Sequence, residues 1–77
     1  MEGFLRFFDH IVHRVPMHFE LTYSKICDWQ LHIWRKGVAD DGGDVEVCYI
    51  QNCDLEYVFA RGQVALKDFL LETEGGY

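Results

Sequence analysis

Residues 4–15 carry apolar side chains at the spacing of one helix face. They recur every three or four positions, at Phe4, Phe8, Ile11 and Val15. Arg6, Asp9, His10, His13 and Arg14 occupy the remaining positions. The pattern predicts an amphipathic helix that ends at Pro16, because the residue before a proline is pushed out of the helical region.

Between residues 17 and 51 the apolar positions alternate with polar ones, which is typical of strands with one buried face. The pattern predicts strands at 17–23, 27–36 and 45–51, separated by a polar turn and by a loop at 37–43. The side chains predicted to face the core are Met17, Phe19, Leu21, Tyr23, Cys27, Trp29, Leu31, Ile33, Val45, Val47 and Tyr49. Those predicted on the opposite, outer face are His18, Glu20, Thr22, Asp28, Gln30, His32, Trp34, Glu46, Cys48 and Ile50. A shift of one residue in any strand would exchange its two faces.

The C-terminal part of the chain predicts a second, longer helix. Its apolar positions keep helical spacing for over four turns, at Leu55, Val58, Phe59, Gly62, Ala65, Leu66, Phe69 and Leu70. Asn52 or Asp54 can cap its start, and Gly75-Gly76 ends it. Gly62 lies on the apolar stripe, where a missing side chain lets another element approach closely. A fourth strand over 55–60 is the alternative.

These elements give one α+β domain over residues 1–77, in the order α-β-β-β-α. A three-stranded antiparallel meander with both helices packed on one face satisfies all the apolar patterns. No element is then left to cover the outer face of the sheet.

The charge balance narrows the classes of partner. The formal net charge is −6, and the seven basic residues are scattered along the chain. An acidic surface repels nucleic acid and anionic membrane and favours basic proteins. No run approaches the roughly 20 apolar residues of a membrane span. Three cysteines without a preceding secretory segment indicate the reducing cytoplasm.

Two surfaces are candidates for binding a partner. On the outer face, Trp34 with Cys48 and Ile50 predicts an apolar patch beside His32, and such patches often mark interfaces. A homodimer through these faces is the simplest partner. The second surface is an acidic cluster in and after the loop, Asp40, Asp41, Asp44 and Glu46, which would attract a basic protein. The plain interpretation of this cluster is a solvated hairpin loop.

Catalytic and metal chemistry find weak support. His10 and His13 share a helix face and His18 follows, so a metal site on these three histidines is an alternative. The cysteines lack the paired spacing of a zinc site, and the only serine, Ser24, lacks a nucleophile elbow. We therefore expect no enzymatic activity and no cofactor.

Two resemblances bear on function. The element order is similar to that of double-stranded-RNA-binding domains, but the start of the second helix reads Cys53-Asp54-Leu55-Glu56, where those domains carry lysines. The C-terminal third, including Asn52-Cys53-Asp54-Leu55-Glu56 and Gly75-Gly76-Tyr77, resembles small uncharacterised proteins of phages and mobile elements in gut Gram-positive bacteria. This resemblance implies a setting and no activity.

The sequence thus predicts a non-enzymatic protein–protein interaction module, encoded by a phage or mobile element. Phages also encode small acidic inhibitors that mimic DNA, so an inhibitor of a host defence nuclease is an alternative on size and charge. In that alternative the acids of the 40–46 segment would replace phosphates in a basic groove.

Overall fold

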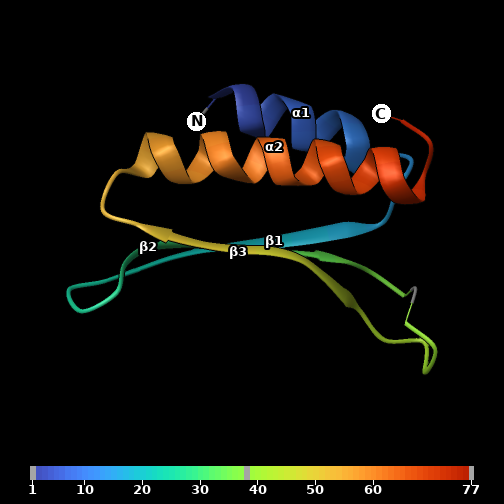
Figure 1. Cartoon of the computed structure of the whole chain (residues 1–77), viewed down its shortest axis with the longest axis horizontal. Coiled ribbons are helices and arrows are strands. Elements are labelled where there is room, and N and C mark those ends of the chain that lie inside the picture. The colour runs from blue at the N-terminus through green and yellow to red at the C-terminus, as the bar shows by residue number, and fades with distance from the viewer. Residues whose placement is uncertain (1, 38, 77) are drawn as a thin grey trace.

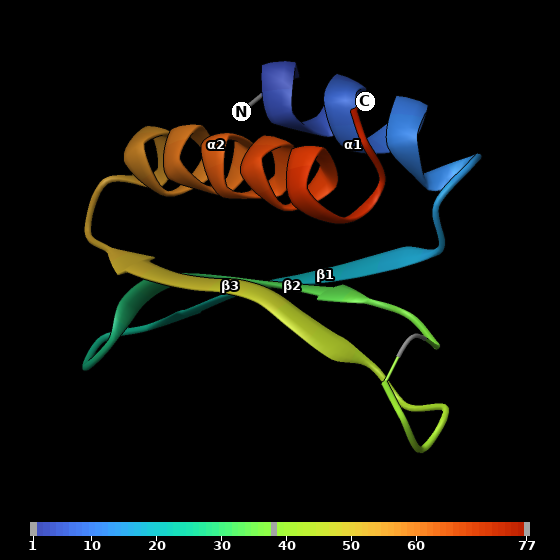
Figure 2. The ribbon, with the colours of Figure 1, turned by 45° about the vertical axis from the view of Figure 1, so that its right-hand side comes forward.

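The computed structural model describes residues 2–37 and 39–76, and it has the element order that the sequence predicts. Helix α1 (Glu2–Val12) is followed by strands β1 (Met17–Ser24), β2 (Asp28–Arg35) and β3 (Val45–Asn52), and then by helix α2 (Leu55–Thr73). The strands form one antiparallel sheet in the order β1-β2-β3. Figures 1 and 2 show both helices on the same side of this sheet. The α+β meander is confirmed.

The first helix ends earlier than its apolar pattern indicates. It stops at Val12, and residues 13–15 form a turn in which Arg14 and Val15 donate backbone hydrogen bonds to Ile11. Pro16 enforces this break. Val15 remains buried after the helix has ended, so its apolar character reflects the core and not a further helical turn.

The second helix follows the prediction closely. The Asp54 side chain accepts hydrogen bonds from the backbone N–H groups of Glu56 and Tyr57, at 3.0 and 3.4 Å, and so caps the start. Asn52 accepts the N–H of Asp54 instead. The helix ends before Gly75, whose φ of +76° suits a residue without a side chain. The alternative fourth strand over 55–60 is wrong.

The core lies between the helices and the inner face of the sheet. Its fully buried members come from both helices and from the middle strand: Phe4, Ile11, Leu31, Ile33, Val58, Phe59, Leu66 and Leu70. Gly62 is buried among them, and a Cβ there would lie 2.4 Å from Leu31 Cδ2. The predicted close approach at Gly62 is confirmed, since α2 touches β2 through this position.

The sheet is arched. In Figures 1 and 2 the β1–β2 turn and the β2–β3 loop both bend to the side away from the helices. The outer face of the sheet is therefore its concave side. None of the helices and strands that the structure describes covers that face, as the sequence predicts.

Candidate interaction surface

The outer face is built from three rows of side chains that cross all three strands. Register pairs β1 with β2 at His18–Trp34, Glu20–His32 and Thr22–Gln30. The same β2 residues pair with Glu46, Tyr49 and Gln51 of β3, respectively. The face is thus polar and aromatic, with its aromatic members concentrated in the first two rows.

Trp34 lies at the centre of a continuous aromatic row. Its ring stacks on that of His32, with centroids 3.9 Å apart and an angle of 29° between the planes. The ring of His18 lies 5.4 Å from Trp34 on the β1 side. On the β3 side Tyr49 meets His32 edge-on at 5.2 Å. These four residues come from the first two of the three rows, and we call them together the aromatic row.

Two carboxylates flank the aromatic row. Glu46 Oε2 is 3.0 Å from His32 Nε2, and Glu20 Oε1 is 3.5 Å from His18 Nε2. Both glutamate side chains remain more than half exposed, at 57% and 61%. They therefore orient the imidazoles and still present oxygens to solvent.

The outer-face placement of Cys48 and Ile50 is wrong. Both pack against the core, opposite Ile33 and Leu31 of β2. The cause is a β-bulge: Trp34 pairs with Glu46 while Ile33 pairs with Cys48, so Val47 is an extra residue in β3. After a bulge the alternation of faces shifts by one.

The same bulge moves Tyr49 to the outer face, although its position predicts a core residue. Its side chain is 49% exposed and contacts His32. Alternation gives no signal for this placement. The candidate surface therefore consists of His18, Glu20, His32, Trp34, Glu46 and Tyr49, of which His32, Trp34 and Glu46 are among the predicted binding residues.

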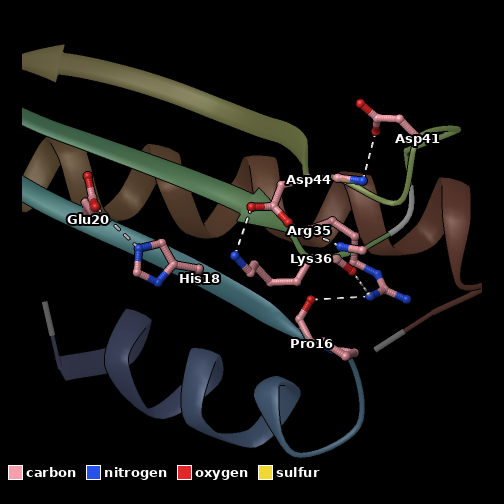
Figure 3. A network of polar contacts seen from close by, with 9 residues as sticks. Pro16, His18, Glu20, Arg35, Lys36, Asp41 and Asp44 are labelled. Carbon is pink, nitrogen blue, oxygen red and sulfur yellow. Dashed lines mark hydrogen bonds and ion pairs between the residues drawn. The ribbon is translucent and has the colours of Figure 1, made fainter.

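The acidic cluster is largely engaged within the chain. Asp44 accepts hydrogen bonds from Lys36 Nζ at 2.9 Å and from the Gly37 N–H at 3.2 Å (Figure 3). The bond from Lys36 lowers the pKa of Asp44. Asp41 accepts the N–H of Gly43 at 2.9 Å, which tightens the loop. Asp40 is exposed in the same loop, whose Val38 lies outside the described residues.

The histidines do not gather around a common point. His13 lies near Asp9 on α1, with 3.6 Å between Nε2 and Oδ1, whereas His18 faces Glu20 on β1. Within residues 2–37 and 39–76, no three His, Cys, Asp or Glu side chains are placed to hold a metal ion. The arrangement gives no support to a metal site on His10, His13 and His18.

The three cysteines are free and differ in environment. Cys53 is exposed, whereas Cys48 packs against the core. Burial, reinforced by the nearby Glu46 carboxylate, raises the pKa of Cys48 to about 11. A thiol with this pKa is a poor nucleophile at neutral pH, because the thiolate is the reactive form.

Alkylation with iodoacetamide at pH 8 is expected to label Cys53 well before Cys48. At that pH the Cys48 thiol, with its pKa of about 11, is almost entirely protonated, and the core restricts access to it. Peptide mass mapping over time measures both rates. Equal rates in the folded protein would contradict the burial of Cys48, and equal rates in denaturant are the control.

A cavity of about 350 Å³ lies between the C-terminal end of α2 and the start of β3. It is lined by Arg35, Val45, Phe69, Thr73 and Glu74. Arg35 Nη2 is 3.2 Å from Glu74 Oε1. The guanidinium also donates to the Pro16 carbonyl, as Figure 3 shows. These contacts link the end of α2 to β2 and to the α1–β1 connection, so Arg35 and Glu74 in the cavity lining stabilise the fold.

Comparison with known proteins found no matching family model, no similar curated protein and no similar solved structure. The resemblance of the C-terminal third to proteins of mobile elements therefore stays a prediction. No helix in the described part of the chain combines the length and the apolar character that a membrane crossing requires.

Proposed function

We propose that this protein is a non-enzymatic interaction module whose outer sheet face binds a basic segment of another protein. The observation that carries the proposal is the aromatic row at Trp34, which is partly exposed on an uncovered sheet face and is flanked by the carboxylates of Glu20 and Glu46. An aromatic centre with a polar rim is the usual composition of a protein-binding hot spot.

The chemistry of the face favours arginine in the partner. A guanidinium stacks on aromatic rings and donates hydrogen bonds to carboxylates at the same time. Tyr49 offers a half-exposed ring and Trp34 a partly exposed one, and Glu46 pairs with Trp34 across the two strands. The net charge of −6 adds long-range attraction for a basic segment.

The acidic cluster is a weaker candidate for binding a basic partner. Asp41 and Asp44 each have a partner within the chain. A nuclease inhibitor that mimics DNA would have to present these carboxylates as phosphate substitutes. The proposal therefore rests on the sheet face and not on the loop.

A short Arg-Gly repeat peptide is expected to shift the indole N–H signal of Trp34 in a heteronuclear NMR titration. The second tryptophan, Trp29, packs against the core and serves as an internal control in the same spectrum. An Asp-Gly repeat peptide is the control ligand. The absence of any shift at Trp34 with the arginine peptide would contradict the proposal.

Substitutions distinguish the contribution of the Trp34 ring to peptide binding from that of the Glu46 carboxylate. Trp34→Ala is expected to weaken peptide binding at least about tenfold, because a hot-spot aromatic contributes 1.4 kcal/mol or more. Glu46→Gln is expected to weaken it less and to reduce its salt dependence. Thr22→Val, two rows away on the same face, is the matched control and should bind normally.

A further inference from the structure

Helix α2 carries a second apolar stripe on the side away from the core. Tyr57, Val64 and Leu71 are 47%, 47% and 54% exposed. They are spaced by seven residues, which is close to two helical turns, so the three side chains lie in one line. A surface helix of a single domain needs only one apolar stripe.

The packing of the domain leaves this second stripe uncovered. The core stripe of the same helix is formed by Val58, Phe59, Gly62, Leu66 and Leu70. Helix α1 approaches α2 from another side, where Lys67 Nζ lies 5.2 Å from the Phe7 ring centre and Gly3 lies near Gln63. In Figures 1 and 2 α1 lies along α2 and farther from the sheet. The line from Tyr57 to Leu71 therefore faces solvent along about 21 Å of helix.

Two exposed charges run beside the stripe. Arg61 and Asp68 are seven residues apart, on the same flank of the line through Val64. If a second α2 packs antiparallel about Val64, Tyr57 of one chain meets Leu71 of the other. In that arrangement the flanking positions also meet, so Arg61 of each chain faces Asp68 of its partner.

A parallel arrangement offers less complementarity. Parallel helices pair one flank with the opposite flank, and the positions next to the stripe on the opposite flank are Ala60 and Lys67. Ala60 has no charge to pair with Arg61, and Lys67 already contacts the Phe7 ring of its own domain, with 5.2 Å between Nζ and the ring centre. The stripe and its charges thus fit an antiparallel copy of the same helix.

We propose that a second copy of this chain packs on the stripe of Tyr57, Val64 and Leu71, with the two α2 helices antiparallel. The twofold axis passes Val64, and two reciprocal Arg61–Asp68 pairs fix the direction. The outer sheet faces then point away from each other and remain free, so each dimer offers two binding faces. The interface is independent of the proposed function of the sheet.

The dimer is expected to be weak, because three half-exposed apolar side chains per copy must offset the loss of translational freedom. Sedimentation equilibrium of the full chain between about 10 µM and 1 mM should show a monomer–dimer equilibrium, since small interfaces associate in this range. A monomer across the whole range would overturn the proposal.

Val64→Glu is expected to raise the dissociation constant of the dimer at least about tenfold, because it places two carboxylates at the twofold axis. Helical circular dichroism and the melting temperature should be unchanged, since Val64 is exposed and glutamate is a good helix former. Trp34→Ala is the matched control on the other surface and should dimerise normally. Dimerisation lost in Trp34→Ala and kept in Val64→Glu would overturn the proposal in favour of paired sheets.

A charge exchange tests the direction of the helices. Arg61→Asp or Asp68→Arg alone should weaken the dimer, because each creates two like-charged pairs in the antiparallel arrangement. The double variant Arg61→Asp with Asp68→Arg should restore it. Failure of the double variant to recover any association would contradict the antiparallel pairing.

Discussion

Phe4→Ala is expected to destabilise the protein by about 3–5 kcal/mol, because it removes a buried aromatic side chain and leaves a cavity. Phe4 is 1% exposed and its ring lies 5.4 Å from Phe19 and 5.1 Å from Phe59. One side chain thus joins α1, β1 and α2. A domain of this size has a total stability of about 4–12 kcal/mol, so the loss would be a large fraction of it.

Urea denaturation followed by circular dichroism measures this change. Leu5→Ala is the matched control, because Leu5 is the next residue of the same helix and is 43% exposed. Its cost should stay below about 1 kcal/mol. Similar losses in the two variants would show that α1 does not pack on the core through Phe4.

Gly62→Ala is expected to destabilise the protein although alanine is the better helix former. The new Cβ would lie 2.4 Å from Leu31 Cδ2 and 3.6 Å from the Phe4 ring. Leu31 is completely buried, so it has no open space into which to move. Overpacking costs about 1–3 kcal/mol, and the gain in helix propensity offsets at most about 1 kcal/mol.

The same substitution in the other helix should have the opposite sign. At Gly3 a Cβ would meet only Gln63 Oε1, at an ordinary contact distance of 3.7 Å. Gly3→Ala is therefore expected to stabilise by roughly 0.5 kcal/mol through helix propensity. Thermal denaturation of both variants provides the comparison, and a Gly62→Ala protein that melts above the parent would disprove the close approach of α2 to β2.

The local elements were predictable because each depends on short-range patterns. Phe4 and Ile11 mark one side of α1, and the alternation of Leu31 and Ile33 marks the buried side of β2. Asp54 caps α2 as its side chain and position predict. Since a three-stranded meander needs one covered face, the same patterns also placed both helices on one side.

The proposed binding face was predictable in part. Trp34 and His32 lie on the outer face, because β2 alternates regularly from Asp28 to Arg35. The sequence could also reveal two apolar stripes on α2. Which of them is buried depends on the position of Gly62, where only a missing side chain allows contact with Leu31.

The sequence by itself determined the element order, the amphipathic faces of α1, β1 and β2, and the acidic charge. Tertiary structure alone decided the register of β3 after Val47, because pairing with Ile33 and Leu31 buries Cys48 and Ile50. That pairing brings Tyr49 to the aromatic row. A bulge is set by the fit of one strand to its neighbour and to the helices above it, and no local pattern in β3 records that fit.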